Sequence, residues 1–108
     1  MRGRYQLAFL IPPDAQKILT EDDWEFSSQQ FLPNSVIDFL LDTLGCVLID
    51  KYLEVVIYTN QNTRASIFHN GLGQINYVHL QLYGDGLSKF LNLFSAHFSD
   101  QEVQVFLP

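Results

Sequence analysis

Cysteine, basic residues and long apolar runs are all scarce in this sequence, and each scarcity excludes something. Cys46 is the only cysteine among 108 residues, so no internal disulfide can form, which favours a reducing compartment. Residues 1–4 include two arginines, but the apolar run that follows contains Gln6 and stops at Pro12, too short for a signal-peptide core. No run reaches the roughly 18 apolar residues of a membrane span. We therefore expect a cytoplasmic protein.

Lysine and arginine together number six against twelve acidic residues, a formal net charge of -6. Binding nucleic acid or an anionic membrane requires clustered cations that neutralise phosphates. The composition therefore argues against both and favours a basic protein as partner. With 47% apolar residues, the chain can build a core without disulfides or metal, as a single globular domain over residues 1–108.

Strand-like segments dominate the middle of the chain, residues 53–83. Residues 53–59 and 65–70 are rich in β-branched and aromatic side chains, and residues 74–83 alternate between apolar and polar. Turn residues separate these segments at 60–63 and at 71–73, where two glycines tolerate positive φ. The pattern predicts a central meander of three antiparallel strands.

The assumed turn lengths predict which side chains of the meander share a face. A four-residue first loop and a three-residue second loop place Ile57 opposite Ser66, and Ser66 opposite Val78. One face, expected to be the core, then carries Val55, Ile57, Phe68, Val78 and Leu80. The other carries Glu54, Val56, Tyr58, Ala65, Ile67, His69, Tyr77 and His79. A two-residue second loop would flip the third strand.

Two main helices and further strands are predicted around the meander. Asn34 and Gly45 suit the beginning and end of a helix whose apolar residues recur every three or four positions. Asp85 is expected to cap a second helix that ends near residue 99. Residues 5–11, 46–49 and 103–107 read as strands, and the second either stops before Asp50 or continues to Tyr52 through a bulge. The expected fold class is α+β, a mostly antiparallel sheet with two main helices on one face.

An acidic segment precedes the first main helix. Thr20 and Asp23 have the spacing of a capping box, with Leu19 and Trp24 placed for a hydrophobic staple. This predicts a short helix over residues 21–30, preceded by a turn that Asp14 caps. The acidic residues can steer a basic partner toward Trp24, although burial of Trp24 by the staple is the simpler interpretation. The segment's predicted partner-binding residues are Glu21, Asp22, Asp23, Trp24 and Glu25.

The second face of the meander has no predicted cover. Tyrosine and histidine on such a face offer apolar area together with a polar group, as binding surfaces do. The alternative is a half-wet sheet face that is partly covered by the N-terminal segment or by a second copy of the chain. The partner-binding residues predicted here are Glu54, Tyr58, His69, Tyr77, His79 and Tyr83.

No catalytic, metal or cofactor motif stands out. The three histidines and Cys46 match no zinc-ligand spacing, and Cys46 follows the end of a helix, where the dipole does not activate a thiol. Glu54 opposite His69 suits acid–base chemistry, but a plain cross-strand pair is the more common arrangement. The glycine turns lack the length and the lysine of a phosphate loop. We expect no enzyme activity, no metal and no cofactor.

Small size, acidic charge and the lack of a catalytic constellation lead to a hypothesis of function. The chain is expected to be a small binding protein that occludes a basic protein partner, as immunity proteins and inhibitors of toxins or nucleases do. One alternative is a homodimeric regulatory or adaptor domain that uses the open sheet face. Another is a small ligand-binding domain or enzyme that uses this face as the floor of a pocket.

Overall fold

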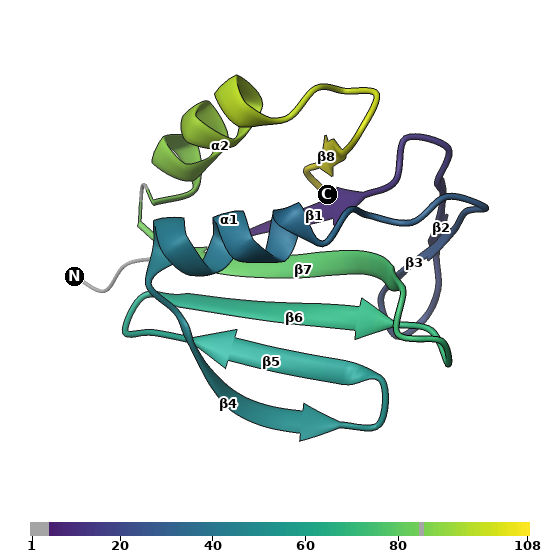
Figure 1. Cartoon of the computed structure of the whole chain (residues 1–108), viewed down its shortest axis with the longest axis horizontal. Helices are drawn as coiled ribbons and strands as arrows, with labels where there is room; N and C mark the ends of the chain where they lie inside the picture. The colour runs from purple at the N-terminus through teal and green to yellow at the C-terminus, as the bar shows by residue number, and fades with distance from the viewer. Residues whose placement is uncertain (1–4, 85) are drawn as a thin grey trace.

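The chain folds as an α+β structure in which two helices lie on one face of an antiparallel sheet (Figure 1). The computed structural model describes residues 5–84 and 86–108, so the basic residues 1–4 and the predicted helix cap Asp85 lie outside the described residues. Six strands form the main sheet in the order β4-β5-β6-β7-β1-β8. They are β1 (Tyr5–Ile11), β4 (Val47–Tyr52), β5 (Val55–Thr59), β6 (Thr63–His69), β7 (Ile75–Tyr83) and β8 (Gln104–Phe106). The predicted fold class and the central meander are confirmed.

Both predicted main helices are present, as α1 (Ser35–Leu44) and α2 (Gly86–His97). α1 ends at Gly45, which has a φ of 64° and donates its N–H to the carbonyl oxygen of Leu41 at 3.0 Å. Asn34 precedes the helix as predicted, but its side chain makes no capping hydrogen bond. The apolar sides of both helices pack on the sheet through Val36, Leu40, Leu87, Phe90 and Phe94.

The predicted pairing of β6 with β7 is wrong by one residue. Ile57 lies opposite Ser66 as predicted, but Ser66 lies opposite His79 and not opposite Val78. A bulge near the start of β7 adds one residue to that strand and shifts its pairing. Because consecutive residues of a strand point to opposite faces, a shift of one residue changes which side chains meet the helices.

Two sets of residues therefore exchange faces relative to the prediction. The helix-facing side carries four residues predicted for the open face: Val56, Tyr58, Ala65 and Ile67. The outer face, away from the helices, carries three residues predicted for the core: Val55, Ile57 and Phe68. Val78 and Leu80 are core residues as predicted, and Tyr77 and His79 lie on the outer face.

β4 forms one edge of the main sheet and extends to Tyr52 through a bulge between Leu48 and Asp50. The continuation through a bulge, one of the two alternatives considered, is therefore the correct one. All six residues of β4 are exposed, including the large apolar side chains of Val47, Leu48 and Ile49. An edge strand with this composition is a site where other chains can attach.

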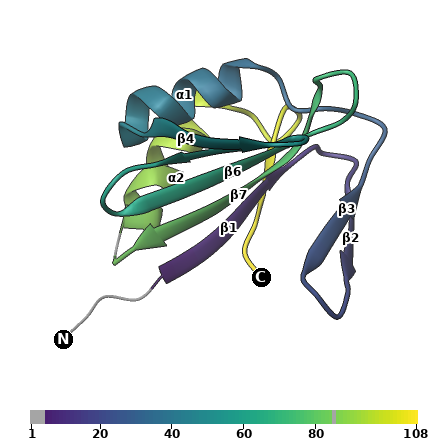
Figure 2. The ribbon, with the colours of Figure 1, turned by 90° about the horizontal axis from the view of Figure 1, so that it is seen from below.

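The predicted short helix over residues 21–30 is wrong, as is the turn before it. These segments form a hairpin of β2 (Gln16–Leu19) and β3 (Trp24–Ser27), which pair only with each other. Figure 2 shows the hairpin leaning away from the main sheet. The Thr20 hydroxyl donates to the carbonyl oxygen of Asp23 at 2.6 Å and accepts from the N–H of Asp23 at 3.2 Å. The Thr-x-x-Asp spacing thus closes a hairpin turn here and does not begin a helix.

Candidate functional site

The predicted binding residues lie in three groups, and the structure brings two of these groups together: the β2–β3 hairpin lies against the outer face of β7. The β2–β3 hairpin holds Glu21, Asp22, Asp23, Trp24 and Glu25. The helix side of the sheet, beside the β4–β5 turn, holds Glu54, Tyr58 and His69. The outer face of β7 holds Tyr77, His79 and Tyr83.

Aromatic side chains attach the hairpin to the outer face of the main sheet. Phe26 lies with its ring centroid 4.9 Å from that of Phe9 in β1 and 4.9 Å from that of Tyr77 in β7. Trp24 meets Phe106 of β8 edge-on at 4.8 Å. We call this cluster the aromatic seat of the hairpin. Its contacts are side-chain contacts, because the hairpin and the main sheet are separate sheets.

Polar contacts add to the aromatic seat at the base of the hairpin. The Asp14 carboxylate accepts hydrogen bonds from the backbone N–H groups of Gln29 at 2.8 Å and Gln30 at 3.3 Å, which ties the two ends of the hairpin together. Lys17 places its Nζ atom 5.4 Å from the centroid of Phe106, a cation–π geometry. The hairpin is therefore held along β3, from its base to Trp24 beside the turn, while Glu21, Asp22 and Asp23 of the turn stay exposed.

Trp24 and Tyr77 of the aromatic seat are among the predicted binding residues, but Phe9, Phe26 and Phe106 are not. The signal for Phe26 was the alternation of Trp24, Glu25, Phe26 and Ser27, in which two aromatic residues on one side alternate with two polar residues on the other. Trp24 and Phe26 are half-buried and Glu25 is exposed, as a strand with one covered face requires. A capping-box spacing outweighed this alternation in the prediction of a helix.

Burial beneath the hairpin changes the titration of two side chains on β7. Burial raises the pKa of Tyr77, and the nearby carboxylates of Asp23 and Glu25 raise it further. Burial lowers the pKa of His79, with Arg64 acting in the same direction and Asp23 in the opposite one. His79 stacks on Phe9 at 4.4 Å between ring centroids, and its buried Nε2 atom has no hydrogen-bond partner among the residues that the structure describes. His79 is therefore a neutral part of the aromatic seat.

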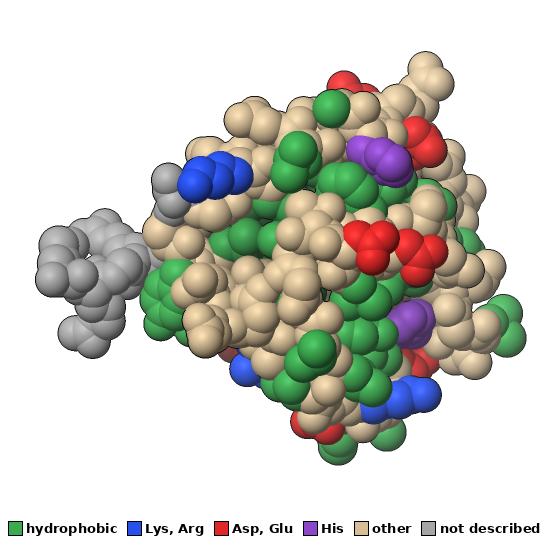
Figure 3. Space-filling model, turned by 60° about the vertical axis from the view of Figure 1, so that its left-hand side comes forward, with side chains coloured by type: hydrophobic (Ala, Val, Ile, Leu, Met, Phe, Trp, Pro, Cys, Tyr) green, Lys and Arg blue, Asp and Glu red, His purple; other side chains and the backbone are tan. Residues whose placement is uncertain are grey.

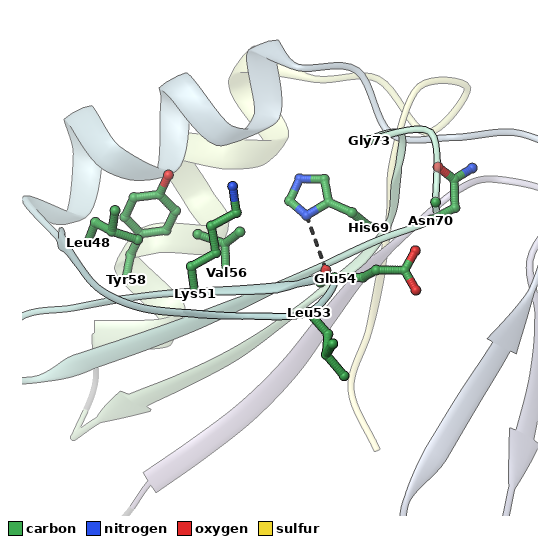
Figure 4. A pocket seen from close by; sticks show the side chains of 10 residues that line it. Leu48, Lys51, Leu53, Glu54, Val56, Tyr58, His69, Asn70 and Gly73 are labelled. Carbon is green, nitrogen blue, oxygen red and sulfur yellow. Dashed lines mark hydrogen bonds between the residues drawn. The ribbon is translucent and has the colours of Figure 1, made fainter.

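A groove of about 510 Å³ lies on the helix side of the sheet, next to the β4 edge. Figure 4 shows Lys51 and Val56 side by side on its floor, between Tyr58 and His69. Figure 3 shows apolar side chains beside a histidine and a basic side chain in the lower half of this side of the molecule. The groove thus combines apolar floor residues with a cation, and its remaining lining is Leu48, Leu53, Glu54, Asn70, Gly71 and Gly73.

Glu54 and His69 lie opposite each other as predicted, but their side chains do not pair. The carbonyl oxygen of Glu54 accepts the backbone N–H of His69 at 2.8 Å, and the Nδ1 atom of His69 lies 3.3 Å from the same oxygen. The Glu54 carboxylate points away from the imidazole in Figure 4. This geometry leaves Nε2 of His69 toward the groove and does not form the acid–base pair considered from the sequence.

The surroundings of Tyr83 and Cys46 indicate a role in packing. Tyr83 stacks on Tyr5 of β1 with ring centroids 4.0 Å apart, and the side-chain hydrogen bond between them raises the pKa of Tyr83. Cys46 is buried, and burial raises the pKa of its thiol. Over residues 5–84 and 86–108, no group of three or more His, Cys, Asp or Glu side chains has the geometry to hold a metal ion.

Within the part of the chain that the structure describes, neither helix has the length and hydrophobicity needed to cross a bilayer. Comparison with known proteins gives no further guide. No protein family, no curated protein and no solved structure matches this chain.

Proposed function

We propose that this chain is a small cytoplasmic binding protein that occludes a basic protein partner by means of its β2–β3 hairpin. One observation carries the proposal: the hairpin leans away from the sheet with an acidic, exposed turn at its end (Figure 2). Residues 14–27 contain five of the twelve acidic residues and only one lysine, Lys17. An extended acidic arm of this shape suits entry into a basic cleft.

The hairpin combines charge at its turn with rigid attachment along β3. Exposed carboxylates attract a positive surface over a distance and raise the rate of encounter. The aromatic seat holds the strands in one orientation before binding, which lowers the conformational entropy lost on association. Trp24 contributes by holding the hairpin on Phe106, while Glu21, Asp22 and Glu25 meet the partner. Inhibition is then steric and electrostatic, as in immunity proteins and in inhibitors of toxins or nucleases.

A capture experiment with matched charge variants tests this proposal. The arm variant carries Glu21→Gln, Asp22→Asn and Glu25→Gln and keeps Asp23, whose side chain accepts the N–H of Trp24. The control variant loses the same three charges elsewhere on the surface through Asp38→Asn, Asp42→Asn and Asp100→Asn. Tagged proteins are used to capture partners from native cell extract at low and high salt.

The expected result is a basic protein retained by the wild type and by the control variant, lost with the arm variant and weakened at high salt. Retention of the same protein by the arm variant would contradict the proposal. So would loss from both variants, because the effect would then depend on net charge and not on the hairpin.

The groove beside β4 supports a second candidate function, the binding of a small amphipathic anion. Its volume of about 510 Å³ lies within the range of ligand pockets, and on its floor the cationic Lys51 lies beside the apolar side chain of Val56. Octanoate is then expected to raise the melting temperature, since a ligand that binds only the folded state stabilises it. Lys51→Gln should abolish this rise and Lys17→Gln should not. An equal rise with uncharged octanamide would exclude an anion site.

A further inference from the structure

The β2–β3 hairpin covers only part of the outer face of the main sheet and leaves the rest of that face uncovered. The aromatic seat involves β1, β7 and β8, and β4, β5 and β6 continue the sheet beside it, with Phe68 of β6 stacked on Tyr77 of the seat at 4.4 Å between ring centroids. Apolar side chains dominate this part: Val47 and Tyr52 are 65% and 68% exposed, and Val55, Ile57 and Phe68 are half-buried. We call the outward side chains of β4, β5 and β6 the outer patch.

The strand register arranges the outer patch in three cross-strand rows. The first row is Tyr52, Val55 and Phe68, and the second is Asp50, Ile57 and Ser66. The third row is Val47, Thr59 and Arg64. β5 forms the middle of every row. The second row has an acidic residue, Asp50, on the β4 side, and the third row has a basic residue, Arg64, on the β6 side.

We propose that two copies of this chain pack their outer patches face to face about a twofold axis that runs along β5. Such an axis lays β4 of one copy over β6 of the other, while the two β5 strands meet at the centre. Face-to-face sheets pack about 10 Å apart with strand directions within about 30° of each other, which this arrangement accommodates. The proposed partner of the outer patch is therefore a second copy of this chain.

The patch is complementary to itself under this symmetry. Tyr52 of one copy lies over Phe68 of the other, an aromatic pair formed twice in the dimer. Asp50 of one copy lies over Ser66 of the other copy. Arg64 of that other copy lies one row further along the same strand as Ser66, at a distance of about 7 Å. The long arginine side chain spans that distance. An acid and a base of opposite sign thus meet twice, once on each side of the axis.

The hairpin sets the limit of the overlap. It seats on β1 and β7, so it flanks the β4 edge of the second copy and leaves only three strands of each sheet to pack. An overlap of three short strands is smaller than a standard protein interface. The dimer is therefore expected to be weak and to form only at high protein concentration. The acidic turns of both hairpins remain exposed in it.

Sedimentation equilibrium of the wild type over a concentration series tests the self-association. A monomer–dimer equilibrium is expected, and a protein that stays monomeric up to about 1 mM overturns the proposal, because a specific dimer weaker than that binds by less than about 4 kcal/mol. Tyr52→Lys removes the aromatic pair and is expected to give a monomer. Far-ultraviolet circular dichroism and thermal melting establish that each variant is folded.

Charge reversal then tests the orientation of the two copies. Asp50→Arg and Arg64→Asp each bring like charges together twice, so each is expected to weaken the dimer by about ten-fold or more. The double variant restores opposite charges and should recover the wild-type constant. Asp38→Arg, the same charge change on the exposed side of α1, should have no such effect. Failure of the double variant to recover overturns this geometry, as does an equal loss with Asp38→Arg.

Discussion

At the scale of single residues, His79 is the polar group whose surroundings fit it least well. Within residues 5–84 and 86–108, its buried Nε2 atom finds no hydrogen-bond partner, and burial lowers its pKa from the usual value of 6.5. The unfolded chain therefore takes up a proton at a higher pH than the folded protein does. Stability is fully present above pH 6.5 and is lost as the pH falls from 6.5 through the lowered folded value.

His79→Phe is expected to remove this part of the pH dependence. Phenylalanine keeps the stacking on Phe9 and has no nitrogen to leave unpaired, so the free energy of unfolding at neutral pH should rise by about 1 kcal/mol. The check is chemical denaturation of both proteins at about pH 7.5 and about pH 5.5. His97→Gln, at an exposed site, serves as the control. An unchanged difference between the two pH values in His79→Phe would show that other groups cause it.

Leu53 adopts a backbone conformation that its side chain disfavours. Its φ is 53°, and its side chain is 80% exposed at the tip of the β4–β5 hairpin, so packing does not compensate for the strain. Leu53→Gly should therefore raise the free energy of unfolding by up to about 1 kcal/mol, less the entropy that glycine loses on folding. Leu53→Val should lower it, because β-branching worsens the clash. Equal stability of the two variants in urea denaturation would contradict this account.

At the scale of elements, the β2–β3 hairpin depends on side chains for its attachment. Phe26 contacts Phe9, Tyr77 and Phe106, and its replacement by alanine should free the hairpin while the six-stranded sheet stays folded. The expected loss of stability is about 1 to 3 kcal/mol. Trp24 is the only tryptophan, so its fluorescence should shift to the red as the ring leaves Phe106.

Hydrogen exchange distinguishes this local release from general unfolding. Amides of β2 and β3 should exchange faster in Phe26→Ala, and amides of β7 should keep their protection. Ile18→Ala, an exposed position of the same hairpin, should leave both regions unchanged. Faster exchange in β7 as well would mean that the hairpin and the sheet unfold as one unit.

The same elements show what the sequence could and could not predict. The two main helices were predictable because their apolar spacing agrees with Asn34 and Gly45 at the ends of the first. The hairpin was missed because the Thr20–Asp23 spacing suits both a helix start and a tight turn, and only contacts with distant rings decide between them. The core-facing side of the meander was predicted wrongly because the bulge near the start of β7 adds one residue, and the local sequence pattern does not show that extra residue.

The sequence indicates which types of residue form the candidate site, but it does not indicate on which face of the sheet they lie. The acidic residues around Trp24 were recognised from composition alone, and they are exposed as binding residues must be. Tyr58 and Tyr77 were grouped on one face, although they lie on opposite faces of the sheet. That grouping depended on a register, and register is fixed by packing between segments far apart in the chain.

At the scale of the whole molecule, the net charge of -6 opposes the compact state. Salt screens repulsion between exposed charges, so the melting temperature should rise between about 0.02 M and about 0.2 M NaCl, where the Debye length falls from about 20 Å to about 7 Å. A fall would mean that attractive surface ion pairs dominate the balance. The measurement is a thermal melt followed by circular dichroism.

The two triple variants of the capture experiment separate this general field from the local role of the hairpin. Each removes three negative charges, so each should lessen the salt response of the melting temperature, because repulsion over the whole surface depends on total charge. Only the arm variant should lose the basic partner, since capture depends on where the charges lie. A salt response lessened in the arm variant alone would instead locate the repulsion within the hairpin. Repulsion between the carboxylates of the acidic turn would then destabilise the free protein, and a basic partner would relieve this repulsion on binding.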